Sequence, residues 1–345
     1  MIFSTNGLKI FLVSIFALSS SICAENFIKD SVAKAMDVSP NKIEFKNLRK
    51  GMTSAKNLKF DLEGKQYIAK VFHKRKKEEA KEKEIAAVKI FSDLNLGTKL
   101  VAAAKDNSFY IREYVPGKTL KFADVQNEKV LKNTAKAMKK LHEFKSDVSS
   151  RNLESRAEKH FKSINKKDIA VPTGFEKSFE QFKNLCSKLK NSKGFCHNDL
   201  NPHNILLTDD ERILFIDFGN SGMGNIYEEL GYFTALSGIF DDALSKFLDF
   251  YFERKATKDE LETVKLAQKI VLFVSACVYF DFSETKNDKK IKKEKRIEKL
   301  DSLLKSGDLP AVFDIIKNNK VPSVRIRNKD RVRQYALACY KEFAS

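Results

Sequence analysis

A hairpin pattern near the centre of the chain sets the strongest limit on its fold. Residues 203–219 (HNILLTDDERILFIDFG) contain two short apolar runs on either side of a Thr-Asp-Asp turn. Short apolar runs around such a turn are typical of two antiparallel strands. A polar turn, residues 196–204 (CHNDLNPHN), leads into the first strand, and Asp217 ends the second. Asn, Asp and Pro are ordinary turn residues, so a capped loop before a hairpin is the plain explanation.

The two ends of this hairpin also bring polar side chains together. Because neighbouring strand ends are adjacent, Asn204 is expected close to Asp217, with Asp199 on the loop just before them. Carboxylate and amide oxygens suit hard cations such as Mg²⁺, which also bind substrate phosphates. Phosphoryl transfer further needs a carboxylate that orients the attacking hydroxyl and receives its proton. The pattern therefore predicts a phosphoryl-transfer site, with a purely structural hairpin as the alternative.

Strand and helix patterns divide the rest of the chain into a β-rich part and a helical part. Residues 43–72 and 99–117 contain the short apolar runs of strands, and residues 78–94 repeat apolar side chains at helical intervals. Pro116-Gly117 breaks this pattern, and the chain beyond it is mostly helical. Helices are expected there at residues 125–144, 175–190, 230–251 and 258–282, while residues 286–345 form charged helix without further assignment.

The turn and hairpin resemble the catalytic and metal-binding loops of a known fold. HNDLNPHNILL with LFIDFG resembles the protein-kinase-like fold and, more narrowly, the choline kinase and aminoglycoside phosphotransferase superfamily of small-molecule kinases. Asn198 stands where protein kinases usually carry Arg, which is similar to the choline and ethanolamine kinase branch. The resemblance implies that Asp199 is the catalytic base, that Asn204 and Asp217 bind the metal, and that His197 braces the loop.

The same resemblance implies an α+β, two-lobed fold that uses ATP and Mg²⁺. The β-rich N-lobe would span residues 25–116 and the larger helical C-lobe residues 117–345. Lys70 of YIAKVF would bind the α- and β-phosphates, and Glu84 would hold this lysine, with Glu82 and Glu78 as fallback choices. An exposed strand lysine and a solvated helix carboxylate are the plain alternatives. The turn KGMTSAKN would cover the phosphates and the segment IREYVPGKTL would meet adenine, through Gly51, Thr53, Ser54, Glu113 and Val115.

The acceptor is expected to be a small-molecule alcohol. A quaternary ammonium group binds over aromatic faces and beside acids, which Tyr227, Glu228, Glu229, Tyr232 and Phe233 could supply. However, Phe218-Gly219-Asn220 departs from the choline kinase pattern and is closer to that of the wider phosphotransferase group. Two other classes stay open: a non-catalytic, exported nucleotide-binding pseudokinase, and a protein kinase. The protein kinase is disfavoured because the segment after Gly219 is short and lacks an Ala-Pro-Glu-like anchor.

Charge and the N-terminus bear on partners and location. The net charge is +18, but the lysines are spread along the chain without a nucleic-acid motif, so no specific nucleic-acid partner is predicted. Residues 1–24 have one lysine, a short apolar run and small residues ending at Ala24, the pattern of a signal peptide cleaved after Ala24. The protein is thus expected to be exported, with a cytoplasmic location as the alternative, and to have no transmembrane span once processed.

Cysteines leave the compartment undecided, and the sequence as a whole does not give the oligomeric state. Cys186, Cys196, Cys277 and Cys339 follow the leader, which allows two disulfides in an exported protein. None has CxxC spacing, so a metal site at these cysteines is not expected. Cys196 and Cys277 lie in apolar surroundings, which indicates buried thiols.

Overall fold

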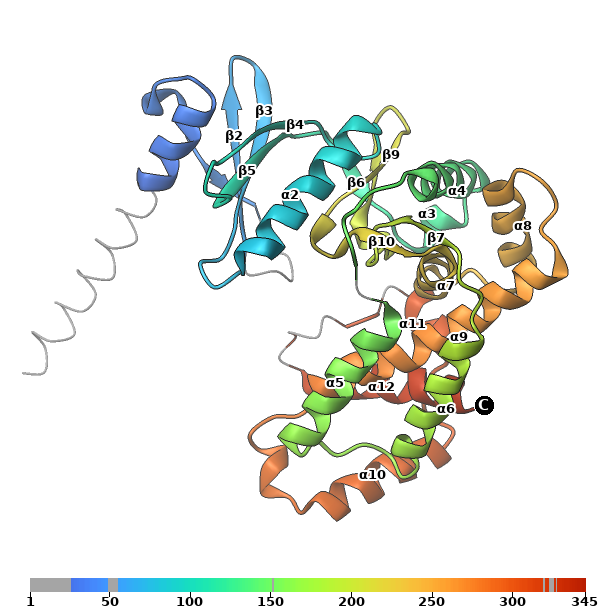
Figure 1. Cartoon of the computed structure of the whole chain (residues 1–345). Helices are drawn as coiled ribbons and strands as arrows, with labels where there is room; N and C mark the ends of the chain where they lie inside the picture. Colours follow the sequence, from blue (N-terminus) through green and yellow to red (C-terminus); the bar gives the residue numbers. More distant parts are fainter. Residues whose placement is uncertain (1–25, 49–54, 151, 319, 323–325, 327) are drawn as a thin grey trace, which may run out of the picture. The chain divides into compact units, whose positions relative to one another are not determined.

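A computed structural model of the chain describes residues 26–48, 55–150, 152–318, 320–322, 326 and 328–345 (Figure 1). The predicted leader, residues 1–24, lies outside these ranges. The protein is α+β, as the sequence predicts, and it divides into two compact units. The first unit holds the described residues up to 85 together with residues 98–115, and the second holds residues 86–97 and 116–345.

The first unit is built on an antiparallel sheet with the strand order β1-β2-β3-β5-β4. Because side chains alternate between the faces of a strand, Ala69 and Ile111 face a core that also contains Val32 from helical residues 26–35. Lys70, opposite Tyr110, lies on the other face. The strands are β1 (Lys46–Asn47), β2 (Lys56–Leu62), β3 (Lys65–Val71), β4 (Leu100–Ala103) and β5 (Phe109–Glu113).

Helix α2 (Glu78–Asp93) confirms the helix expected at residues 78–94. Its residues up to 85 belong to the first unit and the rest belong to the second. In the second unit, Phe91 of α2 stacks on Phe218 with ring centroids 4.2 Å apart. After α2, the Leu96 and Gly97 N–H groups both donate to the Phe91 carbonyl oxygen at 2.9 Å and close the last turn.

Two small sheets in the second unit carry the predicted hairpin. Strands β8 (Ile205–Thr208) and β9 (Ile213–Phe215) pair antiparallel, which confirms it, and β6 (Gly117–Thr119) adds to the outer edge of β8. Strand β7 (Lys193–Cys196) pairs with β10 (Gly222–Asn225), so the chain enters and leaves the hairpin region through adjacent strands.

Helices make up the rest of the second unit, and some of them differ from the sequence prediction. The prediction of a single helix at residues 230–251 is wrong, because Gly238 takes a left-handed conformation (φ +67°) and separates α7 from α8. Helix α5 was not expected at all. The helices are α3 (Phe122–Val125), α4 (Glu128–Glu143), α5 (Leu153–Lys167), α6 (Phe175–Lys188), α7 (Ile226–Ser237), α8 (Asp241–Phe252), α9 (Lys258–Asp281), α10 (Lys293–Lys305), α11 (Val312–Lys317) and α12 (Lys329–Ala344).

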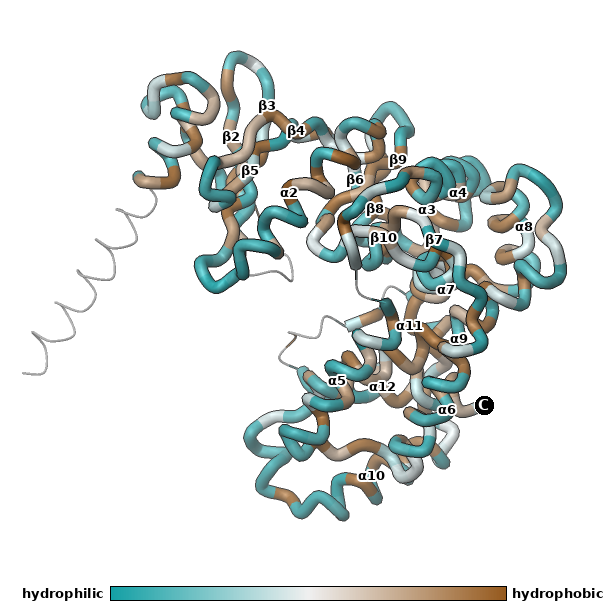
Figure 2. Tube along the Cα trace, in the orientation of Figure 1, coloured by the Kyte–Doolittle hydropathy of each residue, from teal (hydrophilic) through white to brown (hydrophobic). Residues whose placement is uncertain are grey.

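Helix α9 forms the centre of the helical core. It begins at a capping box of Thr257 and Glu260 and packs against α5, α7 and α12. By length and apolarity α9 is the one helix in the described part of the chain that could cross a membrane, yet 61% of its most apolar window is buried inside the molecule. In contrast, most residues of α10 are hydrophilic (Figure 2).

Candidate active site

The loop of residues 197–204 joins β7 to β8 and ends beside the end of β9. The Ile216 N–H donates to the Asn204 carbonyl oxygen at 2.9 Å, next to the antiparallel pairing of β8 with β9. Asp217 then takes a left-handed conformation with φ +67°, which turns the chain out of the strand. Asn204 and Asp217 therefore lie at adjacent strand ends, while their metal-binding role stays a prediction.

Asn204 is oriented by the loop that it ends. Its Nδ2 donates to the Asp199 carbonyl oxygen at 2.8 Å. Within the described residues its Oδ1 makes no hydrogen bond, so this oxygen is the atom left for a cation. A carboxamide oxygen beside a carboxylate is a ligand pair that suits Mg²⁺. The residues present thus fit a divalent cation, which Asn204 and Asp217 would hold.

His197 is buried and ties the loop to the strand that leads to Asp217. Its Nε2 donates to the Ile216 carbonyl oxygen at 2.8 Å, so Nε2 carries a proton. The ring packs against Phe91, Phe215 and Phe218 with centroid distances of 5.8, 6.2 and 5.8 Å. Hydrogen bonding on one side and aromatic packing on the other give His197 the geometry of a bracing residue.

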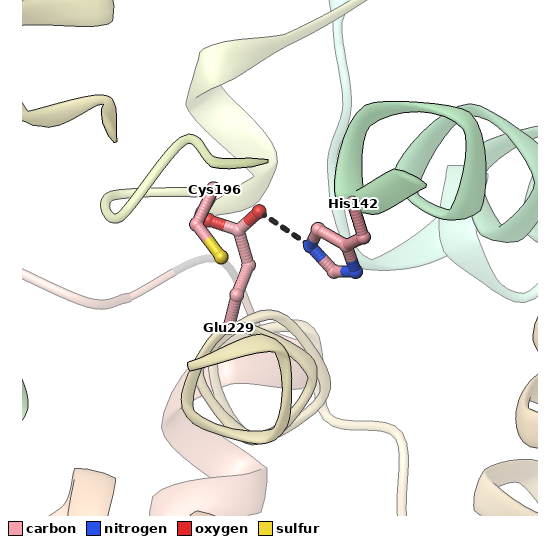
Figure 3. Close-up of side chains that lie close together, drawn as sticks. All are labelled: His142, Cys196 and Glu229. Carbon is pink, nitrogen blue, oxygen red and sulfur yellow. Dashed lines mark hydrogen bonds and ion pairs between the residues drawn. The ribbon is translucent and has the colours of Figure 1, made fainter. Parts of the chain in front are cut away.

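Glu229, on α7, supports the loop from below (Figure 3). Its Oε1 accepts the His197 N–H at 3.1 Å and its Oε2 accepts the Asn198 N–H at 2.5 Å. His142 Nε2, on α4, lies 2.9 Å from Oε1. Asn198 has φ +61°, an uncommon conformation that these bonds hold in place. Glu229 therefore fixes the backbone just before Asp199.

Cys196 completes a buried group with His142 and Glu229 whose donor atoms all lie within 4.8 Å (Figure 3). Thiolate, imidazole and carboxylate groups are the ligand types that bind zinc in proteins. However, both Glu229 oxygens already accept N–H groups, and burial raises the pKa of the Cys196 thiol well above its usual value. On its other side, His142 Nδ1 lies 2.7 Å from the Tyr251 hydroxyl. The group is therefore a hydrogen-bonded support for the loop, and we assign no metal to it.

Asp199 points its carboxylate toward two helices. Its Oδ1 accepts the Tyr232 hydroxyl of α7 at 2.8 Å and lies 3.5 Å from Arg156 of α5. The Asp199 and Arg156 side chains are 25% and 30% exposed, so both remain reachable by a ligand. The pKa of Arg156 lies above its ordinary value because of its electrostatic interactions with Tyr232 and Asp199. Burial raises the pKa of Tyr232.

The other residues considered for the acceptor serve the fold. Glu228 Oε2 accepts the Leu153 N–H at 2.9 Å at the start of α5, and burial raises the pKa of Glu228 to about 6. Phe233 is fully buried and packs on Phe247 with ring centroids 5.3 Å apart. Tyr227 is also buried. Of the five candidates, Tyr232 alone hydrogen-bonds to Asp199 in the described part of the chain.

Lys70 and Glu84 meet in the first unit. Lys70 Nζ lies 2.7 Å from Glu84 Oε1, and both side chains are almost fully buried. The second carboxylate oxygen of Glu84 pairs with Lys76, and the Tyr110 hydroxyl donates to Oε1 at 3.3 Å. Removing one partner of such a buried pair leaves an uncompensated buried charge. We therefore expect a substitution of Lys70 or Glu84 to destabilise the first unit.

The remaining nucleotide residues are less well defined by the structure. The two fallback glutamates, Glu78 and Glu82, bond to half-buried Asn107 at 2.9 and 3.4 Å. Glu113 ends β5, and its N–H donates to the Lys99 carbonyl oxygen at 2.9 Å. Val115 is half-buried in the segment that follows. Gly51, Thr53 and Ser54 lie outside the described residues.

Three of the supporting residues escaped the sequence analysis. Arg156 lies in a segment where no helix was expected, and His142 lies on α4, far from the loop in sequence. Glu229 was considered for the acceptor, whereas its carboxylate holds the loop. The short interval between Asp217 and the first turn of α7 is the one sequence signal that places Glu229 near the site.

Comparisons with known proteins show which family the chain resembles. The sequence profile of the choline/ethanolamine kinase family matches residues 45–300. Comparison with curated protein sequences gave no match.

Solved structures share the fold at low sequence identity. A choline/ethanolamine kinase family protein from Mesorhizobium loti is 16% identical with a TM-score of 0.62, over 90% of this chain and 99% of that one. Choline kinase LicA from Streptococcus pneumoniae is 19% identical with a TM-score of 0.59, over 80% and 98%. LicA has also been solved with AMP. A protein from Ralstonia eutropha, provisionally described as an aminoglycoside phosphotransferase, is 13% identical with a TM-score of 0.52, over 87% and 93%.

Proposed function

Since this chain belongs to the choline/ethanolamine kinase family, we propose that it transfers the γ-phosphoryl group of ATP to the hydroxyl of a small molecule. The loop of residues 197–204 carries the proposal, because its Asn204 carboxamide bonds to the Asp199 carbonyl oxygen and its end bonds to the strand that leads to Asp217. The buried Lys70–Glu84 pair of the first unit supports it. AMP binding by the similar protein LicA supports nucleotide use.

The proposed residues have distinct parts in the reaction. Asp199 orients the acceptor hydroxyl and receives its proton as the oxygen attacks the γ-phosphorus. The acceptor O–H bond breaks, a new O–P bond forms, and ADP departs with the electron pair of the broken bond to the bridging oxygen. Lys70, held by Glu84, neutralises charge on the α- and β-phosphates. A divalent cation held by Asn204 and Asp217 would neutralise charge across the phosphates.

Membership of this family supports an alcohol as the acceptor. A choline- or ethanolamine-like amino alcohol and an aminoglycoside-like polyol are the two acceptor classes that the sequence leaves open. A nucleotide-binding protein without transfer activity is the second candidate, motivated by the leader-like residues 1–24 and the scarcity of ATP outside the cytoplasm. Export with cleavage after Ala24 is part of our proposal, with a cytoplasmic location as the alternative.

Transfer activity tests the proposal directly. The full chain is incubated with Mg·ATP and candidate alcohols, and ADP release and product mass are measured. Asp199→Asn and Asp217→Ala are each expected to lower kcat about 100-fold or more, because both groups act in the transition state. Asp209→Asn removes an exposed acid from the turn of the same hairpin and should leave kcat unchanged.

The outcomes separate the candidates. Full activity of Asp199→Asn would remove the assigned base and with it the proposed mechanism. Binding of Mg·ATP without transfer to any alcohol supports the non-catalytic candidate, and transfer to proteins alone supports a protein kinase.

A further inference from the structure

A guanidinium group stands beside the carboxylate that we assign as the catalytic base. One terminal nitrogen of Arg156 lies 3.5 Å from Asp199 Oδ1 and 3.3 Å from the Tyr232 hydroxyl. The guanidinium carbon is 5.5 Å from the centroid of the Tyr232 ring. An alcohol that hydrogen-bonds to Asp199 therefore comes within reach of a positive charge.

Helix α5 is anchored on both sides of Arg156. At the start of the helix, Glu228 Oε2 accepts the Leu153 N–H at 2.9 Å. One turn beyond Arg156, His160 Nδ1 lies 2.8 Å from Asp281 Oδ2 on α9. The backbone of α5 is thus fixed to α7 and α9, and the guanidinium itself bonds to the Tyr232 hydroxyl.

Most of the hydrogen-bonding capacity of Arg156 is unused. A guanidinium carries five N–H donors in a planar fork. Among the described residues one of its three nitrogens has partners, and the distance to Asp199 is at the long limit for a hydrogen bond. The remaining donors match the two oxygens of a carboxylate or a phosphate, which arginine binds bidentately.

The surroundings of Asp199 are poorly suited to a quaternary ammonium ion. Such a cation needs aromatic faces and acids without a competing positive charge. The two acids that follow Asp217 in the chain already have hydrogen-bond partners. Glu228 bonds to the start of α5, and Glu229 bonds to the loop of residues 197–204. Asp199 already shares its charge with Arg156. A cationic acceptor would therefore meet a guanidinium where it needs an uncompensated carboxylate.

We propose that the acceptor alcohol also carries an oxyanion, a carboxylate or a phosphate, which pairs with Arg156 while its hydroxyl bonds to Asp199. Arg156 is then the residue that determines acceptor specificity and selects against choline-like cations. This inference rests on the proposed function, which supplies Asp199 as the base. If Arg156 instead contacted the travelling phosphoryl group, its effect would not depend on the charge of the acceptor.

Binding and transfer with matched alcohols test the proposal. The full chain is titrated without nucleotide by calorimetry, and kcat and KM are measured with Mg·ATP. The acceptors are choline, ethanolamine, glycerol, serine, glycerate and glycerol 3-phosphate, of which the last two distinguish a carboxylate from a phosphate. Arg156→Gln is expected to weaken binding of the preferred oxyanionic alcohol and to raise its KM about ten- to a hundredfold, the usual effect of losing a hydrogen bond to a charged group.

Three comparisons make the result specific. Arg156→Lys should recover part of the affinity because it keeps the charge, while kcat of both variants should stay within a few fold of wild type. Lys159→Gln removes a positive charge from an exposed position on the same helix and should leave KM unchanged. Thermal melts of each variant show whether α5 is still folded.

Several results would overturn the inference. Choline or ethanolamine binding more tightly than every oxyanionic alcohol is one, and failure of all oxyanionic alcohols to bind is another. A fall in kcat with every acceptor and no change in KM would assign Arg156 to the phosphoryl group instead. Failure of the proposed function is distinct, because Mg·ATP would not be consumed with any acceptor while the nucleotide-free titrations would still report on Arg156.

Discussion

Glu229 links the catalytic loop to the helical core through a single carboxylate. Its two oxygens accept the N–H groups of His197 and Asn198 and lie beside His142. Burial alone would raise the pKa of Glu229, but its hydrogen bond and charge interaction with His142 hold that pKa below the ordinary value. Glu229 is therefore ionised at neutral pH, and a charged acceptor makes stronger hydrogen bonds to the loop than a neutral one.

Glu229→Gln should lower kcat while leaving the KM for ATP nearly unchanged. The glutamine amide turns an N–H₂ group toward one of the three donors, so one loop N–H or His142 loses its partner and the loop shifts. A displacement of about 1 Å at a catalytic group costs about 100-fold in rate, and we expect a loss of about 10- to 100-fold. Steady-state kinetics with both substrates measures it.

Glu143→Gln is the matched control, because it changes an exposed glutamate next to His142. Equal kcat in Glu229→Gln and wild type would show that the loop does not depend on this carboxylate.

Local sequence predicts the residues that one loop brings together and misses those that helices bring from elsewhere. Asp199, Asn204 and Asp217 are joined by a single hairpin, so their spacing alone places them near one another. Arg156 and His142 come from α5 and α4 and reach the loop only because these helices pack in the same unit. No periodicity within their own segments marks them as parts of a site.

At the level of elements, α5 is attached to α9 by one buried acid. The Asp281 carboxylate is 5% exposed and bonds to His160, Ser163 and Lys167 of α5 at 2.8, 2.7 and 2.6 Å. Burial alone would raise its pKa, but these three hydrogen bonds lower the pKa of Asp281 to about 2. The folded state thus favours the ionised form.

The lowered pKa predicts how this attachment depends on pH. A carboxyl whose pKa is lower in the folded state stabilises the fold above its unfolded pKa, near 3.8, and this contribution is lost as pH falls toward 2. Asp281→Asn should therefore lower the free energy of unfolding by about 2 kcal/mol at pH 7. The difference from wild type should shrink between pH 4 and pH 2, as urea unfolding at several pH values measures.

Asp308→Asn, which changes an exposed acid after α10, is the control and should stay within about 0.5 kcal/mol of wild type. A wild-type advantage over Asp281→Asn that is as large at pH 3 as at pH 7 would contradict the assigned ionisation.

Helix boundaries show the same limit of sequence reasoning. Apolar residues recur throughout residues 230–251, which predicts a single helix. However, a Cβ atom at position 238 would lie 2.9 Å from the Phe122 ring, and the positive φ of Gly238 ends α7. Charged residues lie near both ends of helix α12, which hides that Tyr335, Leu337 and Phe343 are buried against the core around α9. Both features depend on which segments pack together, and this is not encoded within either segment.

At the scale of the whole molecule, the cysteines do not decide in which compartment the protein works. Cys186, Cys196, Cys277 and Cys339 are free in the structure, and the last three are buried, so the two disulfides that the sequence allowed are not formed among them. Burial raises the pKa of Cys277 and Cys339. Such thiols are unreactive in the folded state, so they are compatible with either compartment.

The proposed cleavage after Ala24 lies just before the first part of the fold. Residues 26–35 are helical, and Val32 and Ala33 are fully buried in the core of the first unit with Ile43 and Phe60. Processing at this position therefore keeps all of these core residues in the mature chain.

Two truncated chains test this boundary. A chain that begins at Glu25 should have the same free energy of unfolding as the full chain, because it keeps the helix of residues 26–35. A chain that begins at Asp37 loses the buried Val32 and Ala33 side chains and should be less stable by about 2–4 kcal/mol, the usual cost of removing buried apolar groups. Urea unfolding measures both, and mass spectrometry of the exported protein should give a mature N-terminus at Glu25. Equal stability of the two truncated chains, or a mature N-terminus beyond Val32, would place the boundary elsewhere.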